Sequence, residues 1–366
     1  MEFDYIKVCS NFNIVGEPKS CVRFGEGHIN YTFLLTTLEG EKERKYVLQR
    51  INNRIFPRVD KLMRNIELVT EFTRSKIREC GGDADRESLT LVYTKDGKSY
   101  MYDEQSKEYF RVYKFIDDAI SYQLAKSPEL FYYSAVAFGN FANRLADFNA
   151  SELFEVIPDF HNTVKRFNDF LSSIKENKSN KASSVKKEID FVLARENYCS
   201  RIVELLKSGA MPMRVTHNDT KLNNVMLDSI TGKPVAVVDL DTVMPGSICY
   251  DFGDSIRFGC NTALEDEKDL NMVNFDLELF ESYVKGYLGA VGQNITDIEK
   301  ENLAFGAILM TYECGMRFLS DHLDGDVYFN VKRENHNLDR ARTQFKLVEE
   351  MEKVYDKMQE IVEKYS

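Results

Sequence analysis

Basic residues are fewer than acidic residues in this sequence. Lysine and arginine number 48 against 59 aspartates and glutamates, so the 366-residue chain has a formal net charge of −11. Nucleic-acid binders and membrane-surface binders depend on basic patches, so this balance argues against both classes. Proline is also scarce, at 7 residues, and 43% of the residues are hydrophobic, which is typical of a folded globular chain. The length is sufficient for two lobes, each with a core of its own.

Closely spaced cysteines and long apolar runs are missing as well. No two cysteines lie within ten residues of each other, which argues against a disulfide framework and against a CxxC metal site. No apolar run reaches the length that spans a bilayer. The first residues, MEFDYIKVCSNF, lack a basic segment followed by an apolar stretch. We therefore expect a cytoplasmic protein with no signal peptide and no membrane segment.

The first third of the chain contains short strand-like runs. Two of them, 29–38 and 45–51, flank the polar stretch EGEKER, which predicts a hairpin turn. A helix is expected from Asp60, as its N-cap, to Cys80, where a Gly-Gly pair ends it. The further strands expected in this part are 21–25, 89–94, 99–102 and 109–116.

From about residue 127 the pattern becomes helical. Helices are expected over 128–149, 160–176 and 187–207, with several more after residue 262. The last helix, 337–365, carries an apolar stripe at spacings of three and four residues. The stripe is short, which favours packing within the chain, and so a monomer, over a dimeric coiled coil. The prediction is an α+β chain with a small β-rich lobe over 1–116, ending in a hinge strand, and a larger helical lobe over 117–366.

The strongest chemical signal is the segment HNDTKLNNVMLD, which contains H-x-D-x-x-x-x-N at His217, Asp219 and Asn224. A kinase catalytic loop needs an Asp that orients the attacking hydroxyl and accepts its proton, and a nearby Asn that binds Mg²⁺. The following MLDSITGKPVAVV predicts strand, turn and strand, which would fold Asp239 back toward Asn224. Because carboxylate and amide oxygens suit Mg²⁺, the set predicts magnesium-assisted phosphoryl transfer.

Each of these residues taken singly also has a structural interpretation. Asp219 and Asn224 could cap turns, and His217 could be a core imidazole; the ordered set favours catalysis. The nearby YDFGDS contains the D-F-G triplet that binds metal in protein kinases. Because Asp251 follows a loop and opens a helix-like segment, we expect it to cap or hold a loop, with metal binding as the minor alternative.

A glycine-rich turn, GEGHINYTF, lies between two expected strands. Gly25 and Gly27 would let backbone N–H groups approach phosphates, and His28 and Asn30 could add side-chain donors. No G-K-[ST] follows, so the turn is not a Walker A loop. Taken alone, it favours an ordinary hairpin, because Gly pairs between strands usually form one. Its value lies in preceding the helix and the catalytic loop in the order found in kinases.

The small-lobe lysine of kinases is absent from the strand where it is expected. In YVLQR, Gln49 occupies its place and Arg50 lies on the opposite face. Glu67, in the following helix, is the expected counterpart of the kinase helix Glu. The hinge strand RVYKFID, with Arg111 and Tyr113, is expected to lie against the adenine. The missing lysine keeps open a non-catalytic, nucleotide-binding pseudokinase.

The order of these motifs resembles the aminoglycoside phosphotransferase and choline kinase superfamily, which has a bilobal protein-kinase-like fold. Blocks along nearly the whole chain are also similar to those of N-acetylhexosamine 1-kinases. They include NIELVT, DLDTVMPGS, TALEDEKDL, ECGMRFLSDHLDGDVYF and HNLDRARTQFKLVEEME. The resemblance implies ATP-dependent phosphorylation, with Mg²⁺, of the anomeric hydroxyl of N-acetylglucosamine or N-acetylgalactosamine.

The resemblance also implies a set of site residues. Asp219 would be the catalytic base and a substrate ligand, and Asn224 and Asp239 would be the magnesium ligands. Arg317 and Tyr328 would hold the sugar hydroxyls. His28 would lie near the reacting centre, and Gln49 need not mean inactivity.

On the residues alone, a salt bridge within the acid-rich helical lobe is favoured for Arg317, and a half-buried packing ring is favoured for Tyr328. The motifs do not distinguish the sugar from another small hydroxyl acceptor, such as an aminoglycoside, choline or homoserine. The pseudokinase is the alternative from another class.

Overall fold

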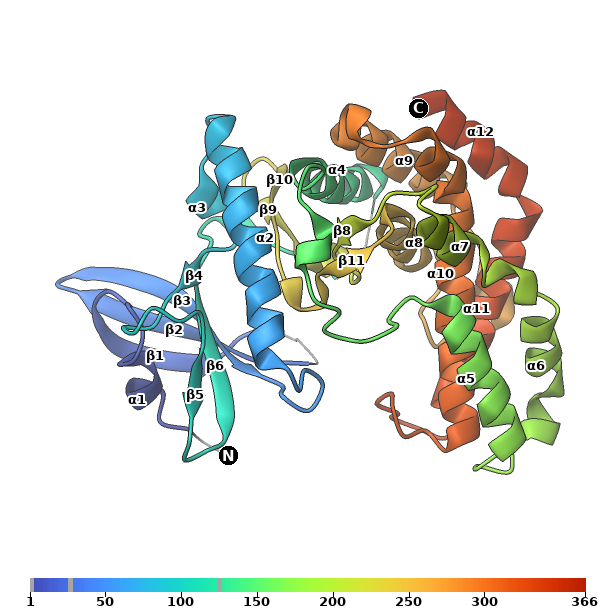
Figure 1. Cartoon of the computed structure of the whole chain (residues 1–366), viewed down its shortest axis with the longest axis horizontal. Coiled ribbons are helices and arrows are strands. Elements are labelled where there is room, and N and C mark those ends of the chain that lie inside the picture. The colour runs from blue at the N-terminus through green and yellow to red at the C-terminus, as the bar shows by residue number, and fades with distance from the viewer. Residues whose placement is uncertain (1–2, 26–28, 124–126) are drawn as a thin grey trace. The chain divides into compact units, whose positions relative to one another are not determined.

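The computed structural model describes residues 3–25, 29–123 and 127–366. Two compact units make up the chain (Figure 1). Unit 1 consists of Met1–Ile120, Glu152–Ile157 and Met226–Val243, and unit 2 consists of Ser121–Ser151, Pro158–Val225 and Met244–Ser366. This partition differs from the predicted boundary at residue 116, because two later segments return to unit 1.

Unit 1 contains a six-stranded antiparallel sheet in its described part. The strands pair in the order β1-β2-β3-β6-β4, and β5 also pairs with β6. The predicted hairpin of β2 and β3 is confirmed, but most of EGEKER is strand. The turn consists of Gly40 and Glu41, because Glu39 already pairs with Lys42. Gly40 has a positive φ of 65°. The strands are β1 (Glu17–Arg23), β2 (Tyr31–Glu39), β3 (Lys42–Ile51), β4 (Leu91–Val92), β5 (Met101–Asp103) and β6 (Glu108–Lys114).

Alternating apolar residues of the sheet form one core with the start of the chain. Leu35, Leu48 and Phe110 are fully buried there and pack with Val8 and Phe12, at and after helix α1 (Tyr5–Cys9). The long helix α2 (Val59–Glu79) also belongs to unit 1, as does the short α3 (Ala84–Glu87).

The predicted start of α2 is wrong by two residues. Arg58 is the N-cap, and Asp60 lies in the first turn, where its carboxylate pairs with the Arg58 guanidinium at 2.6 Å. The helix begins earlier because Pro57 lies just before the cap and Val59 is buried as its first residue. An acidic side chain in the first turn also stabilises the helix, because its negative charge interacts favourably with the positive end of the helix dipole.

The later segments join unit 1 through specific backbone contacts. Strand β7 (Ala119–Ile120) pairs with β9 (Val225–Asp228), which pairs with β10 (Pro234–Val237). This confirms the predicted hairpin before Asp239. Buried Asn65 of α2 donates to the carbonyl oxygens of Phe154 and Val243 and accepts from the Phe154 N–H.

Unit 2 is mainly helical. Helices α4 and α9 pack together, and α10 packs on α8, α11 and α5 (Figure 1). Its elements are α4 (Pro128–Arg144), α5 (Thr163–Glu176), α6 (Lys186–Leu193), α7 (Arg201–Ser208), β8 (Arg214–Thr216), β11 (Met244–Gly246), α8 (Ile248–Gly259), α9 (Leu277–Val291), α10 (Asp297–Asp324), α11 (His336–Lys353) and α12 (Tyr355–Tyr365).

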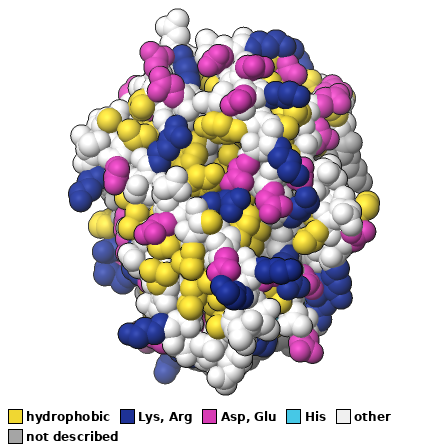
Figure 2. All heavy atoms as spheres, turned by 90° about the vertical axis from the view of Figure 1, so that its right-hand side faces the viewer, with side chains coloured by type: hydrophobic (Ala, Val, Ile, Leu, Met, Phe, Trp, Pro, Cys, Tyr) yellow, Lys and Arg dark blue, Asp and Glu magenta, His cyan; other side chains and the backbone are white. Residues whose placement is uncertain are grey.

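Two of the predicted helices are each divided in the structure. The helix expected over 187–207 is α6 and α7 with a short 3-10 turn between them, and the helix expected over 337–365 is α11 and α12, divided at Val354. On the face shown in Figure 2, basic and acidic side chains are interspersed, with apolar side chains between them. In the described part of the chain, no helix combines the length and apolar character that crossing a membrane requires.

Candidate active site

The predicted catalytic loop follows β8 in unit 2 and is held by α8. The two oxygens of the Asp251 carboxylate accept the backbone N–H groups of His217 and Asn218, each at 2.7 Å. These bonds fix a tight bend, because Asn218 has the left-handed φ of 63°. The loop-holding role predicted for Asp251 is therefore confirmed. Burial raises the pKa of Asp251 to about 6, although the backbone donors and His217 favour its charged form.

The next residue of α8 that binds the loop is Asp254. Its carboxylate accepts the Thr220 N–H at 3.2 Å and pairs with Arg257 at 2.7 Å. Ser255 adds a bond from its hydroxyl to the Thr220 carbonyl oxygen at 2.8 Å. Residues 251–255 of α8 thus bind the loop on both sides of Asp219, at residues 217–218 and at Thr220.

The structure brings Asp219 and Asn224 together, as the motif predicted. The Asn224 amide nitrogen donates to Asp219 Oδ2 at 3.1 Å and to the Asp219 carbonyl oxygen at 2.8 Å. Both bonds use the amide nitrogen, so the amide oxygen remains for a cation. Lys221 was missed by the sequence analysis. Its ammonium lies 2.8 Å from Asp219 Oδ1.

The charge of Lys221 is stabilised by its surroundings. Burial by itself lowers the pKa of Lys221, but the carboxylates of Asp219 and Asp254 more than offset this and hold it above its ordinary value. Lys221 follows the predicted base by two residues, and this spacing was the signal in the sequence that could have identified it. A cation is expected there because it favours the charged forms of the neighbouring carboxylates, Asp219 and Asp254.

Unit 1 contains a second buried polar network, centred on Asp241. Its carboxylate lies 2.5 Å from the Arg111 guanidinium and also accepts from the Asn30 amide. The Arg111 Nε donates to Gln49 Oε1 at 2.9 Å, and Gln49 Nε2 donates to Thr32 at 3.0 Å. Asp241 was not predicted as a site residue, although the two acids that follow an apolar strand, in the sequence DLD, were the available signal.

Arg111 is the charged neighbour of Gln49 in this network. Arg111 stands directly opposite Gln49 on the neighbouring strand β6 and is 1% exposed. Burial by itself lowers the pKa of Arg111, but the Asp241 carboxylate raises it by more than burial lowers it. The pKa therefore lies above its ordinary value, and the guanidinium stays charged. Arg111 also lies 5.3 Å from the Tyr113 ring centre. A buried cation is thus present beside Gln49, supplied by a different strand.

Glu67 is not brought to this cation. Its carboxylate pairs with Arg64 on the same helix at 3.5 Å. The α2 residue that meets Arg111 is Met63, one turn earlier, with its sulfur 3.8 Å from Nη1. The ion pair of the buried Arg111 is formed with Asp241, and the Glu67 carboxylate of α2 pairs with Arg64 instead.

Asp239 follows β10 in the left-handed conformation, with φ 61° and ψ 62°. Its side chain is exposed, and its charge also acts on the pKa of Arg111 and of Tyr113. Gly25, at φ 72°, has a conformation that favours glycine. Gly27 and His28 lie outside the described residues.

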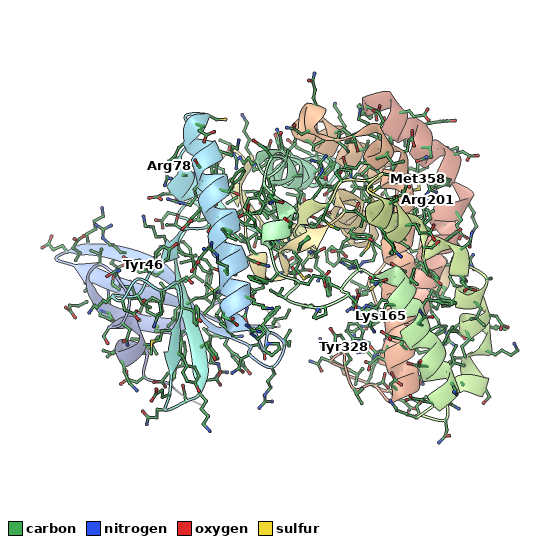
Figure 3. The ribbon with its side chains drawn as sticks, viewed as in Figure 1. Tyr46, Arg78, Lys165, Arg201, Tyr328 and Met358 are labelled. Atoms are coloured by element: carbon green, nitrogen blue, oxygen red, sulfur yellow. The ribbon has the colours of Figure 1, made fainter. Side chains whose placement is uncertain are left out.

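The two residues expected to bind the acceptor lie together in unit 2. The Arg317 guanidinium of α10 is 5.5 Å from the ring centres of Phe160 and Phe329 and 6.0 Å from that of Tyr328. Arg317 makes no ion pair in the described part of the chain, which argues against its salt-bridge interpretation. Tyr328 is 68% exposed, so it is not a half-buried packing ring (Figure 3).

A buried carboxylate fixes the loop that carries Tyr328. Asp321, near the end of α10, accepts the N–H groups of Val327, Tyr328 and Phe329 at 2.8–2.9 Å. It also accepts from the Asn337 amide at 2.8 Å. An exposed aromatic residue on an anchored loop is suited to contact a ligand, because little conformational entropy is lost on binding.

The donors available for a metal fit magnesium. Asn224 offers an amide oxygen and Asp239 a carboxylate, and Mg²⁺ prefers such oxygen ligands together with water and substrate phosphates. Within residues 3–25, 29–123 and 127–366, no group of three or more His, Cys, Asp or Glu residues could hold a metal by itself.

The fold is that of small-molecule kinases. A microcompartment-associated aminopropanol kinase matches with a TM-score of 0.61 and 14% identity, over 97% of this chain and 98% of that chain. An aminoglycoside phosphotransferase from Alicyclobacillus acidocaldarius matches with a TM-score of 0.60 and 13% identity, over 100% and 98%. A choline kinase from Cryptosporidium parvum matches with a TM-score of 0.57 and 14% identity, over 96% of each chain. These similarities show the fold.

The family follows from the sequence. The model of the phosphotransferase enzyme family (APH) matches residues 20–288. The chain therefore belongs to the phosphotransferase enzyme family. The matched range includes the predicted catalytic loop, Asp239 and the Asp241 network.

Proposed function

We propose that this protein is an N-acetylhexosamine 1-kinase, which transfers the γ-phosphoryl group of ATP to the anomeric C1 hydroxyl of N-acetylglucosamine or N-acetylgalactosamine. The observation that supports this acceptor is Arg317. It is surrounded by three aromatic rings and has no ion-pair partner in the described part of the chain. A guanidinium among aromatic faces suits hydroxyl and carbonyl oxygens of a neutral sugar, with the rings against the C–H faces.

In the proposed mechanism Asp219 orients the sugar hydroxyl and accepts its proton late in the transfer. Lys221 and Asn224 fix the orientation of its carboxylate. Mg²⁺, when bound through Asn224 and Asp239, neutralises charge on the triphosphate. Little covalent chemistry is needed, so most of the rate comes from positioning.

The nucleotide is proposed to bind to the following residues of unit 1. Arg111, with Gln49, takes the place of the kinase lysine, and Tyr113 lies on the same strand. Gly25, Gly27, His28 and Asn30 belong to the glycine-rich turn expected at the phosphates, and His28 is proposed to reach the sugar as well. Glu67 contributes only through the surface of α2, because its carboxylate pairs with Arg64.

Another hydroxyl acceptor is the competing possibility. Aminopropanol, choline and aminoglycosides, after which the three similar structures are named, carry amine or ammonium groups. An acceptor of that kind would be repelled by Arg317, because no carboxylate forms an ion pair with this guanidinium in the part of the chain that the structure describes. A neutral acceptor avoids this repulsion.

A panel of acceptors tests the proposal. ADP release is measured with ATP, Mg²⁺ and each of N-acetylglucosamine, N-acetylgalactosamine, choline, 1-amino-2-propanol, homoserine and kanamycin, and ³¹P-coupled NMR locates the phosphate. The expected result is turnover with the N-acetylhexosamines and phosphate on C1. Turnover with a cationic acceptor alone would overturn the sugar assignment. Nucleotide binding without ADP release for any acceptor would instead support the pseudokinase.

Arg317→Ala gives a second, independent test. The substitution removes the proposed contact with the acceptor, so the acceptor KM is expected to rise by about tenfold or more while the KM for ATP changes little. Arg342→Ala is the matched control, because Arg342 pairs with Glu188 at 2.6 Å on another helix surface. Equal rises in both KM values would show that Arg317 has a structural role.

A further inference from the structure

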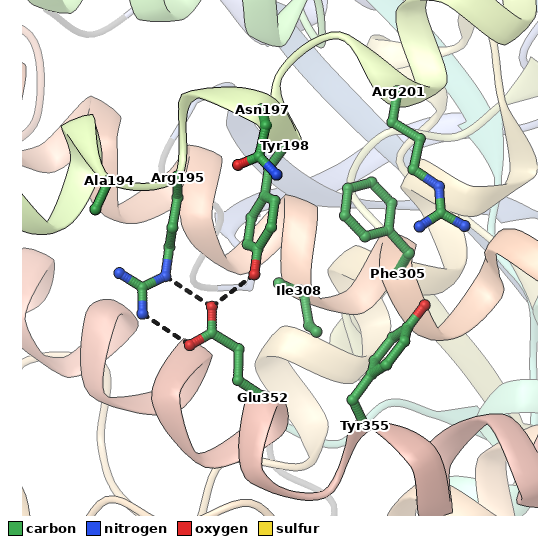
Figure 4. A pocket seen from close by; sticks show the side chains of 9 residues that line it. All are labelled: Ala194, Arg195, Asn197, Tyr198, Arg201, Phe305, Ile308, Glu352 and Tyr355. Atoms are coloured by element: carbon green, nitrogen blue, oxygen red, sulfur yellow. Dashed lines mark hydrogen bonds and ion pairs between the residues drawn. The ribbon is translucent and has the colours of Figure 1, made fainter.

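Unit 2 contains a pocket that takes no part in the proposed reaction. It has a volume of about 550 Å³, within the range of small-molecule sites. Its walls come from the segment between α6 and α7, from α7 and α10, and from the junction of α11 and α12 (Figure 4). The two breaks that divide the predicted long helices therefore both line it.

One wall of the pocket is electrically neutral. The Arg195 guanidinium pairs with both oxygens of the Glu352 carboxylate, each at 2.7 Å. The Tyr198 hydroxyl donates to the same carboxylate at 2.9 Å (Figure 4). This fork satisfies Glu352, so the wall presents neither a spare negative charge nor a spare positive charge to a ligand.

The other wall carries a positive charge that no carboxylate neutralises. Arg201 donates through Nε to Asn302 Oδ1 at 2.8 Å, and its guanidinium carbon lies 4.4 Å from the centre of the Phe305 ring. In the described part of the chain it forms no ion pair. Its two terminal amino groups remain available. Figure 4 shows them on the same side of the pocket as the Tyr355 hydroxyl.

We propose that this pocket is a second binding site, for a small monocarboxylate carried on a flat ring. Two terminal N–H groups of a guanidinium match the two oxygens of a carboxylate. The partly exposed rings of Tyr198 and Tyr355 offer flat apolar surface to the body of the ligand, whereas Phe305 is buried and packs against Arg201. One uncompensated charge, in a chain of net charge −11, favours a monoanion over a dianion such as a phosphate monoester.

The site is separate from the acceptor region. Phe305 and Arg317 both lie on α10, twelve residues apart, which is about 18 Å along a helix axis at about 1.5 Å per residue. The proposal does not depend on the proposed kinase activity. Its test uses binding alone and involves no turnover.

The experiment is a ligand-observed NMR titration of the full chain with four probes. Benzoate has the ring and the carboxylate, benzamide replaces the charge, acetate lacks the ring, and phenyl phosphate carries the second charge. Each is titrated against the wild type, Arg201→Gln, Tyr355→Phe and Lys207→Gln. Lys207 is the matched control, because it is an exposed cation on the same helix and does not line the pocket.

Benzoate is expected to bind most tightly, with a Kd lower than those of benzamide, acetate and phenyl phosphate by about fivefold or more. Arg201→Gln should raise the benzoate Kd to that of benzamide, and Tyr355→Phe should raise it by about twofold to fivefold. Lys207→Gln should leave it unchanged. Equal benzoate affinity in the wild type and Arg201→Gln would overturn the site. Tighter binding of phenyl phosphate would overturn the ligand class, and no saturable benzoate binding would overturn both.

Discussion

The carboxylate of Asp219 is held at both oxygens, by Lys221 on one and by Asn224 on the other. Asp219→Asn keeps the shape of this side chain but removes the proposed proton acceptor. We expect kcat to fall by about 10²–10⁴-fold while the melting temperature changes little. Steady-state kinetics with the acceptor found by the panel and a thermal melt check this.

Asp169→Asn is the control for Asp219→Asn. Asp169 is an exposed residue that pairs with Lys165 on α5, so its substitution should leave kcat unchanged. Near-normal turnover of Asp219→Asn would show that the loop does not supply the base. A large loss of melting temperature would show that the ion pair with Lys221 is chiefly structural.

The raised pKa of Asp251 predicts how the stability of the folded chain depends on pH. Burial raises its pKa in the folded chain to about 6, above the ordinary value of an unfolded Asp near 3.9. Between these two values the folded state binds the proton and the unfolded state does not. The contribution of this group to the free energy of unfolding therefore falls as the pH rises through this window, by roughly 3 kcal/mol in all, and is constant above it.

Asp251→Asn isolates this effect, because an amide does not titrate. The free energy of unfolding by urea is measured for both proteins at pH 4.5 and pH 7.5. The wild type is expected to lose stability relative to Asp251→Asn as the pH rises. A relative gain would mean that the two backbone N–H bonds outweigh burial and hold the pKa below its ordinary value.

At the scale of single residues, the HNDTKLNN motif predicted part of the candidate site. The short spacings within HNDTKLNN placed Asp219 beside Asn224, and Asp251 was correctly expected to hold a loop. Arg111 and Asp241 could not be paired from the sequence. They lie 130 residues apart, and only the return of the β9–β10 hairpin to unit 1 joins them.

The packing of α8 on α10 requires glycine at two positions. A Cβ at Gly306 would lie 2.5 Å from the Cys249 carbonyl oxygen, and one at Gly253 would lie 2.3 Å from the Gly306 oxygen. Gly306→Ala should therefore force the helices apart and destabilise the chain by about 1–3 kcal/mol. Because α8 carries Asp251, kcat should fall as well. Urea unfolding and kinetics measure the two effects.

Gly289→Ala is the matched control for Gly306→Ala. Gly289 lies within α9, and a Cβ there would meet nothing within 4 Å. Its substitution should stabilise the chain by up to about 1 kcal/mol, because alanine is the better helix former. Similar losses in both variants would refute the account of the helix contact.

The sequence predicted most elements but not all their ends. Hairpins were predictable because alternation and turn residues are local signals. The breaks in 187–207 and 337–365 were not, since neither range contains Gly or Pro. Val354 ends α11 at φ −118° and ψ 15°, where the chain must redirect the apolar face of α12 toward α9 and α10. Tertiary packing, which is absent from local sequence, decides such breaks.

For the whole molecule, an α+β chain with a β-rich first part and a helical second part was predicted and is confirmed. The partition into units differs because β7 finds its partner in β9, more than a hundred residues later. Composition shifts reveal where helices begin, but they carry no information on which distant strand pairs with which.

This partition predicts how fragments fold. A fragment ending at Ile120 contains the whole six-stranded sheet, but it lacks Asp241, so the buried Arg111 would have no carboxylate partner. Leaving a buried charge unpaired costs about 3–5 kcal/mol, and β7 would also lack β9. We expect no cooperative thermal unfolding of fragment 1–120 by circular dichroism.

The same fragment joined by a flexible Gly/Ser linker to residues 226–243 should unfold cooperatively, and Arg111→Met should partly restore folding to fragment 1–120. A cooperative transition of fragment 1–120 matching that of the linked form would show that the sheet is stable without the later hairpin, and that the Arg111–Asp241 pair forms only after unit 1 has folded.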